Sequence, residues 1–426
     1  MKKKIAFYTL GCKLNFAETA TISRNFNKID FDIVKFKDIA DIYVINSCLV
    51  TKEAEKKSRS AVRQAYKRNP KAVIAIIGCY SELKPDELKK IEEATLILGN
   101  KDKFNLKVYI DNLNKEKNKN FRPDEFIPAY SIDERTRAFV KIQDGCNYYC
   151  TYCIVPFARG VSRSAAPNLI INITNELSKK GISEIILTGV NIGDYRFKNN
   201  DYSSNSVNKE YKLTDLLIEL EKSNIKRFRL SSIEPDLLKD EIIDFIAQSQ
   251  HFTPHFHIPL QSGSDKILKL MNRRYDSSFF ISKITKIINK IPDCLIALDV
   301  IVGFPGETDE DFDVTYNFIK DLPVAYCHIF PYSEREFTKA TAFSGSVDIS
   351  IRKQRLKSLQ QLSDNKKALF YSQNINSKRQ VLFESSNING FMYGFTENAY
   401  LGLFTSVFQK MNSCSNFRSH ATLCKV

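Results

Sequence analysis

The stretch GCNYYCTYC, residues 145–153, decides how this sequence is read. It places Cys146, Cys150 and Cys153 within eight residues, at the spacing C-x3-C-x2-C. Residues 138–143 just before it predict a β-strand, and a compact loop after that strand can turn three thiolates toward one point. The stretch therefore predicts a metal centre.

The number of cysteines in this loop indicates which centre it holds. A cubane 4Fe-4S cluster normally takes four protein thiolates, so a trio leaves one iron open. The amine and carboxylate of the methionine half of S-adenosylmethionine can chelate that iron, and an electron passed into the sulfonium then yields a 5′-deoxyadenosyl radical. We expect Tyr152, beside Cys153, to pack on the cofactor's adenine. The alternative is structural zinc, which usually pairs C-x2-C with a second, distant pair that is absent here.

The rest of the chain from residue 138 onward predicts a partial (βα)6 barrel. Its expected strands are 138–143, 184–187, 227–230, 255–258, 295–302 and 325–330, with helical stretches between most of them. Such a barrel carries its chemistry at the carboxyl ends of its strands. The segments 187–193, 229–235, 257–263 and 302–308 combine Gly or Pro with polar groups at those ends, which predicts a pocket. Cofactor contacts are expected there from Gly189, Asn191, Arg229, Ser231 and Gln261. For His257 a hydrogen-bonding role is favoured over metal ligation.

A second group of cysteines lies in the first hundred residues. Expected strands 4–9, 42–46, 72–78 and 95–98 alternate with expected helices 15–28, 52–68 and 84–93, which predicts a parallel α/β sheet. Cys12, Cys48 and Cys79 each follow a strand, and parallel strands end at one edge of a sheet. We therefore expect these thiols to converge on a second open-iron cluster that could hold a sulfur species. The alternative is three unrelated buried thiols.

Domain organisation follows from these patterns. We expect an α/β domain over 1–110, a linker over 111–134, a barrel over 135–368 and a small β domain over 369–426. Strands are expected at 380–384 and 389–396, and the pattern becomes divergent after 398. The remaining cysteines show no ligand spacing and receive no function: Cys294, Cys327, Cys414 and Cys424. The first two adjoin barrel strands and are expected in the core.

Composition bounds the partners and the compartment. Lys and Arg number 63 against 49 Asp and Glu, a surplus of +14 that suits a polyanion, although a general bias toward Asn, Lys and Ile can inflate it. The longest apolar stretches fall short of the ~20 residues that span a membrane. The start resembles a first strand more than a secretion signal. Ten cysteines without such a signal predict a reducing, cytoplasmic setting and no membrane partner.

Taken together, these motifs resemble the radical S-adenosylmethionine methylthiotransferases over about residues 3–398. The matching segments are 9–15, 46–48, 78–79, 145–160, 229–235, 257–263 and 299–308. Residues 11–15 and 158–164 look most like the branch that methylthiolates C2 of threonylcarbamoyladenosine beside the anticodon of tRNA. The resemblance implies a flavodoxin-like domain, a radical barrel and a tRNA-gripping TRAM-like β domain. It also implies two 4Fe-4S clusters, held by Cys12, Cys48 and Cys79 and by Cys146, Cys150 and Cys153.

The resemblance further implies that two S-adenosylmethionine molecules are used per turnover, one to methylate sulfur and one to make the radical. It leaves the electron donor and the sulfur source unidentified. Phe337 stands where the family usually has Gly. Alternative substrates are isopentenyladenosine in tRNA or an aspartate of a ribosomal protein. An alternative of another class is a non-catalytic zinc protein that binds RNA.

Overall fold

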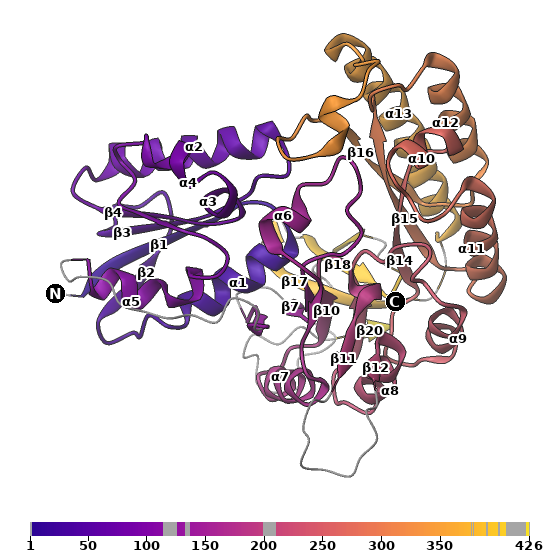
Figure 1. Cartoon of the computed structure of the whole chain (residues 1–426). Coiled ribbons are helices and arrows are strands. Elements are labelled where there is room, and N and C mark those ends of the chain that lie inside the picture. Colours follow the sequence, from indigo (N-terminus) through magenta and orange to yellow (C-terminus); the bar gives the residue numbers. More distant parts are fainter. Residues whose placement is uncertain are drawn as a thin grey trace. The chain divides into compact units, whose positions relative to one another are not determined.

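The computed structural model describes residues 2–113, 126–132, 137–198, 210–375, 377, 379–388, 391–398, 401–405 and 423–425. Much of the expected linker, and Cys414, lie outside the described residues. The chain forms two compact units. The first holds Met1–Ser131, Asp144–Arg163 and Ser333–Thr338, and the second holds Ile132–Gln143, Ser164–Tyr332 and Lys339–Val426. The loop with Cys146, Cys150 and Cys153 thus groups with the amino-terminal residues. Figure 1 labels the elements of both units.

A five-stranded parallel sheet organises the first unit. Its strands are β1 (Lys3–Thr9), β2 (Phe31–Val34), β3 (Ile42–Ser47), β4 (Val73–Gly78) and β5 (Leu96–Leu98). They lie in the order β2-β1-β3-β4-β5, and every pair is parallel. This order is the flavodoxin-like one, which confirms the expected fold. The sequence reading missed β2, a short edge strand in which only Phe31 is buried.

Helices cover both faces of this sheet. On one face α2 (Lys52–Arg68) packs Ala61, Val62 and Ala65 against strand residues such as Ile45 and Ile76. On the other face α1 (Lys13–Ser23) and α5 (Leu106–Asp111) cover a second apolar cluster. The short helices are α3 (Cys79–Leu83), α4 (Pro85–Lys89) and η1 (Lys103–Asn105). Buried on both faces, the central strands read as continuous apolar runs, as parallel strands do.

Two helices expected from the sequence end early. The one expected at 15–28 stops at Ser23, because the side chain of Asn27 accepts the backbone N–H groups of Ile29 and Asp30 and forms a turn instead. The one expected at 84–93 stops at Lys89. β6 (Ala129–Tyr130) follows along the chain and contacts α1, with Tyr130 hydrogen-bonded to Thr21.

Six parallel strands form the partial barrel of the second unit, as expected. They are β7 (Arg137–Lys141), β10 (Glu184–Thr188), β13 (Arg227–Leu230), β14 (His255–Gln261), β15 (Leu295–Val302) and β16 (Tyr326–Pro331). The helices between and after them are α7 (Pro167–Lys179), α8 (Leu213–Glu221), α9 (Asp240–Gln248), α10 (Asp265–Leu270), α11 (Ser277–Lys290), α12 (Asp309–Asp321) and α13 (Ile349–Gln373). Figure 1 shows α10 to α13 on one side of β14, β15 and β16. Cys294 and Cys327 are buried, as expected.

The carboxy-terminal residues add an antiparallel sheet to the second unit. Its strands are β17 (Gln380–Ile388), β18 (Phe391–Thr396), β19 (Leu401–Thr405) and β20 (Leu423–Lys425), in the order β19-β18-β17-β20. Two of them follow residue 398, where the sequence pattern fades. The minor elements are β8 (Gln143–Asp144), α6 (Val155–Arg159), β9 (Arg163–Ser164), η2 (Ile192–Asp194), β11 (Arg196–Lys198), β12 (Glu210–Lys212) and η3 (Lys339–Ala342). Among the described residues, no helix combines the length and the apolar character needed to cross a membrane.

Candidate functional site

The first cysteine trio lies at one edge of the first unit's sheet. Cys12 follows β1 and caps α1, the residue after β3 is Cys48, and Cys79 follows β4 as the first residue of α3. These three strands are neighbours in the sheet. Gly11 and Gly78, which precede two of the cysteines, have φ of 92° and 97°, a region that favours glycine. The turns thus bring the three cysteines to one edge.

The surroundings of the three thiols agree with this placement. Burial raises the pKa of Cys48 to about 12, and negative charge on Cys79 and Cys12 would raise it further. Cys12 is exposed and Cys79 is half-buried, so both thiols remain accessible from the surface. A Cβ atom on Gly11 would lie 2.8 Å from Cys48 Sγ. A buried thiol such as that of Cys48 ionises readily only when a cation neutralises it, which fits a metal centre.

The second cysteine trio lies on a loop that closes on itself. The backbone N–H of Cys146 donates to Gly160 O at 3.1 Å, and that of Cys153 donates to Cys150 O at 2.9 Å. Gly145 has φ of 71°, and a Cβ atom there would lie 2.0 Å from Val161 O. This contact explains why glycine precedes the first cysteine. Tyr152 is half-buried on the same loop.

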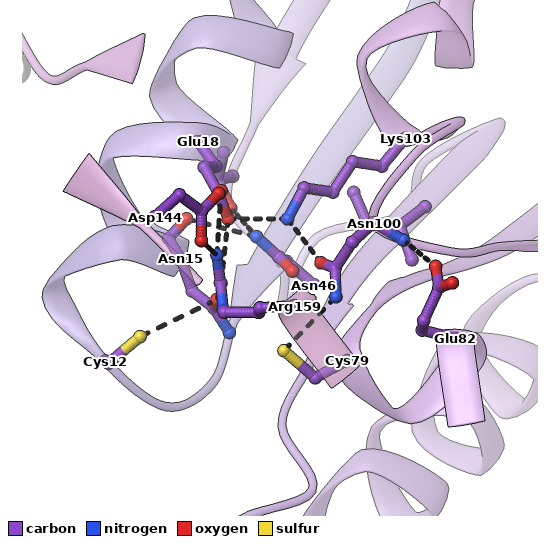
Figure 2. A network of polar contacts seen from close by, with 12 residues as sticks. Cys12, Asn15, Glu18, Asn46, Cys79, Glu82, Asn100, Lys103, Asp144 and Arg159 are labelled. Atoms are coloured by element: carbon purple, nitrogen blue, oxygen red, sulfur yellow. Dashed lines mark hydrogen bonds and ion pairs between the residues drawn. The ribbon is translucent and has the colours of Figure 1, made fainter. Parts of the chain in front are cut away.

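Arg159, six residues after Cys153, is the centre of a buried ion cluster (Figure 2). Its guanidinium lies 3.1 Å from the carboxylate of Glu18, 3.0 Å from Asp144 Oδ1 and 2.7 Å from Asn15 Oδ1. Burial alone would lower the pKa of Arg159, but Glu18 and the thiols of Cys79 and Cys12 keep it well above its usual value. The positive charge is therefore permanent and lies close enough to stabilise thiolates at the first trio.

Two more residues join this cluster to Cys79. Lys103, at 1% exposure, donates to Glu18 at 2.6 Å and to Asn100 Oδ1 at 2.7 Å. The amide of Asn100 lies 3.6 Å from Cys79 Sγ and donates to Ala158 O at 2.7 Å. Sequence reasoning missed Glu18, Asn100 and Lys103, because single polar residues with no motif around them carry no signal of burial.

In the second unit, polar atoms without partners gather at the carboxyl ends of strands. Asn191 and Ser231 follow β10 and β13 at 3% and 5% exposure, and among the described residues their side-chain polar atoms have no hydrogen-bond partner. Gln261 ends β14 with φ of 67°, a strained value for a residue other than glycine. A Cβ atom on Gly189 would lie 2.8 Å from Gln143 Oε1. Buried polar groups of this kind point to a ligand that completes their hydrogen bonds.

Arg229 and His257 lie deeper in the second unit's sheet. Arg229 Nε donates to Glu184 Oε1 at 3.2 Å, whereas Nη1 and Nη2 have no partner among the described residues. His257 Nε2 lies 2.8 Å from Asp299 Oδ1, which agrees with the expected hydrogen bond, and with His328 these residues also place three possible metal-ligand atoms within 4.8 Å of one another.

Phe337, which replaces a usual glycine, has φ of 71°. The position therefore retains the backbone conformation that glycine would favour. Its ring lies 6.4 Å from that of Phe157. Nearby, Arg335 pairs with Glu55 at 2.7 Å, so the segment Ser333–Thr338 is held within the first unit.

Comparison with known families gives two matches. Residues 140–319 match the radical SAM superfamily, and residues 4–99 match the uncharacterized protein family UPF0004. The first match implies an iron–sulfur cluster and S-adenosylmethionine.

Curated relatives cover most of the chain. The threonylcarbamoyladenosine tRNA methylthiotransferase MtaB of Bacillus subtilis is 39% identical over 84% of this chain and 80% of its own length. The MtaB of Aquifex aeolicus is 38% identical over 86% and 90%. A tRNA-2-methylthio-N(6)-dimethylallyladenosine synthase of Endomicrobium trichonymphae is 33% identical over 82% and 80%.

Solved structures share the fold at low sequence identity. The radical S-adenosylmethionine methyltransferase TsrM of Kitasatospora setae has a TM-score of 0.51 and 12% identity, and covers 78% of this chain and 72% of its own. The cobalamin-dependent radical enzyme OxsB has a TM-score of 0.52 and 12% identity, over 85% of this chain and 56% of its own. These likenesses support the fold alone.

Proposed function

We propose, since the chain belongs to the MtaB family of radical S-adenosylmethionine methylthiotransferases, that it attaches a methylthio group to C2 of threonylcarbamoyladenosine beside the anticodon of tRNA. The observation that carries this proposal is the pair of cysteine trios. The trio of Cys12, Cys48 and Cys79 converges at one sheet edge in addition to the closed loop with Cys146, Cys150 and Cys153. One trio would suffice for a radical alone, whereas inserting sulfur calls for a second centre.

The two trios would hold two 4Fe-4S clusters, each with one iron left open. When bound, the clusters and S-adenosylmethionine supply a radical strong enough to break the C2–H bond of adenine, together with the methylthio group that replaces the hydrogen. No acid–base side chain could activate that bond, so the chain's own residues bind, orient and exclude water.

The buried ion cluster indicates how the residues around the first trio act on a bound cluster. Arg159 keeps a fixed positive charge near Cys12 and Cys79. Asn100 offers its amide to the sulfur of Cys79. A fixed charge and an amide donor near a cluster's sulfurs are known means of setting its reduction potential. We therefore propose that Arg159 and Asn100 help to set the reduction potential of a cluster held by the first trio.

We further propose that Tyr152, Gly189, Asn191, Ser231 and Gln261 contact S-adenosylmethionine. The unpartnered buried atoms of Asn191 and Ser231 support this assignment, because a bound cofactor would complete their hydrogen bonds. Arg229, also expected from the sequence to contact the cofactor, offers a site for a carboxylate. A tRNA substrate implies that the enzyme acts in the cytoplasm. The reaction also needs an electron donor and a source of sulfur.

Three other functions make different predictions. The dimethylallyladenosine synthase of E. trichonymphae is 33% identical to this chain, below the 39% of the B. subtilis MtaB, which favours threonylcarbamoyladenosine as the substrate. A ribosomal protein aspartate would leave tRNA nucleosides unchanged. A non-catalytic zinc protein would be colourless after anaerobic purification, whereas an iron–sulfur protein is brown.

Mass spectrometry of tRNA nucleosides tests the proposal directly. The chain is expressed in cells that lack their own methylthiotransferase for threonylcarbamoyladenosine. We expect the methylthio derivative of that nucleoside to appear with the wild-type gene. It should be absent with a Cys146→Ala variant, and equally absent with a Cys48→Ala variant. A methylthio group on isopentenyladenosine instead, or product formation without Cys48, contradicts the proposal.

A further inference from the structure

The interior of the second unit's barrel holds a cation with two free donor atoms. Arg229 is 5% exposed, yet its Nη1 and Nη2 have no hydrogen-bond partner among the described residues. Leaving buried donors unpaired is costly, more so when the group is charged. Two adjacent guanidinium N–H groups match the two oxygens of a carboxylate, which they bind as a fork. The geometry at Arg229 is therefore that of an anion-binding site.

The residues around Arg229 leave positive charge to spare. Glu184 accepts from both Arg229 and Arg227, and these arginines, with Arg137, hold the pKa of this buried carboxyl below its usual value. Glu184 is thus ionised but faces three cations. Glu397 acts on Arg227, whose other contacts are the carbonyls of Gln380 and Phe395. Glu397 is shared with Arg379, so the three guanidiniums around Glu184 favour one more anion.

Aromatic and imidazole rings lie on β14 and β16, in the three-stranded sheet that follows β13 along the chain. Burial raises the pKa of Tyr326 on β16, and the charge of Arg229 counteracts this effect. The Tyr326 ring lies 5.2 Å from that of His328, which lies 5.4 Å from that of His257. Asp299 pairs with His328 in the strand register and receives the hydrogen bond of His257. Because side chains alternate along a strand, Cys327 points the other way, toward Lys366 of α13.

The position of Arg229 separates it from the cofactor candidates. Its guanidinium reaches Glu184, the first residue of β10, whereas Asn191 and Ser231 follow the carboxyl ends of β10 and β13. Ligands of such barrels bind at the carboxyl ends and project inward. A carboxylate at Arg229 therefore belongs to the part of a ligand that reaches deepest.

We propose that Arg229, with His328 and His257 beside it, binds the carboxylate of the threonyl group on the target adenosine, and so selects the substrate. This rests on the proposed function. A threonylcarbamoyl group carries a carboxylate and a hydroxyl, whereas a dimethylallyl group is a hydrocarbon that would leave the guanidinium buried and unpaired. Sites built to hydrogen-bond a polar group reject analogues that lack it. The methionyl carboxylate of S-adenosylmethionine is the other possible source of the same chemistry.

Binding measurements on the reconstituted holoenzyme distinguish these sources. The probes are anticodon stem-loop RNAs that carry threonylcarbamoyladenosine, its carboxylate methyl ester or isopentenyladenosine, and S-adenosylmethionine alone. We expect wild type to bind the acid about ten- to hundredfold tighter than the ester, since a charged hydrogen bond is involved. Arg229→Gln should bind acid and ester alike and keep its affinity for S-adenosylmethionine. The matched control Lys226→Gln removes an exposed charge three residues before Arg229 and should keep the preference.

The possible results distinguish a failure of this inference from a failure of the proposed function. If Arg229→Gln weakens S-adenosylmethionine and leaves the preference for the acid intact, the cation serves the cofactor and the inference is overturned. If Arg229→Gln weakens the binding of the acid and of the ester by the same factor, the inference is overturned as well. His328→Asn, at an exposed position, should lower the preference even if Arg229→Gln does not fold, and an unchanged preference overturns the inference. Wild type that methylthiolates the acid but binds the ester equally well overturns this inference alone. Wild type that methylthiolates only isopentenyladenosine overturns the proposed function.

Discussion

Arg159 and Glu18 form a buried ion pair at 3.1 Å, and each follows a cysteine of its own trio by six residues, Cys153 and Cys12 respectively. Their side chains are 3% and 1% exposed. The pair therefore ties the loop of the second trio to the helix that follows the first cysteine of the other trio. Both trios depend on the same cluster of charges within one compact unit.

Removing the charge of Arg159 should destabilise the first unit. In Arg159→Gln the carboxylates of Asp144 and Glu18 each lose a buried cationic partner, while the pair of Glu18 with Lys103 remains. Breaking a buried pair costs about 3–5 kcal/mol, because a charge is left unpaired. Urea unfolding of the cluster-free protein measures this loss. The control is Arg163→Gln, whose pair with Asp144 is 24% exposed on the arginine side and should cost about 1 kcal/mol or less. Equal losses for both variants would show that the ion cluster contributes little.

Gly145 should tolerate no side chain. A Cβ atom there would meet Val161 O at 2.0 Å, and φ is 71°, so Gly145→Ala must move the backbone just before Cys146. We expect the reconstituted protein to bind about half of the wild-type iron, because the loop no longer presents its thiolates. The control is Gly181→Ala, which also has positive φ, of 80°, but at the end of α7. It should cost about 1 kcal/mol of stability and leave iron content unchanged. Full iron content in Gly145→Ala would contradict this account of the loop.

Asp311, in the first turn of α12, should stabilise the folded protein in a pH-dependent way. Burial alone would raise the pKa of Asp311, but hydrogen bonds from Lys266, Thr308 and Ser264 lower it to about 2. Because the folded-state pKa is depressed, the stabilisation is present above the unfolded value near 4 and is lost as the pH falls toward 2. Asp311→Asn should therefore cost about 1–2 kcal/mol at pH 7, where it also weakens the capping box with Thr308.

Denaturant unfolding at several pH values checks this prediction. The difference between Asp311→Asn and wild type should shrink steadily from pH 4 to pH 2. The exposed carboxylate Asp309 offers a control in the same first turn of α12, since Asp309→Asn removes a negative charge and its pair with Arg355 but leaves the capping box intact. A difference for Asp311→Asn that is constant with pH would rule out the charge as its source.

Local patterns in the sequence were enough for most of the fold. The expected strands 227–230 and 295–302 match β13 and β15 to the residue. The second is apolar apart from Asp299, as buried parallel strands are, whereas Arg227 and Arg229 interrupt the first. The helix expected at 52–68 likewise matches α2, which Thr51 caps through a hydrogen bond to Ala54. The edge strand β2 escaped detection because an edge buries too few side chains to produce such a run.

The candidate site was predictable where residues share a motif, and not where they meet only in space. Cys12, Cys48 and Cys79 could be grouped because each follows a strand of one parallel sheet. Lys103 could not be anticipated, since its burial depends on Glu18, a residue 85 positions away. The unpartnered nitrogens of Arg229 are also a tertiary property, because only the folded barrel shows which of its donors Glu184 satisfies.

Iron and sulfide content after anaerobic reconstitution tests the central claim that two cysteine trios hold two separate clusters. Three proteins are compared: wild type, the triple variant Cys12→Ala, Cys48→Ala and Cys79→Ala, and the triple variant Cys146→Ala, Cys150→Ala and Cys153→Ala. We predict about eight irons and eight sulfides per wild-type chain and about four of each in either variant. About four irons in wild type, or an undiminished content in the variant lacking Cys12, Cys48 and Cys79, would contradict the account.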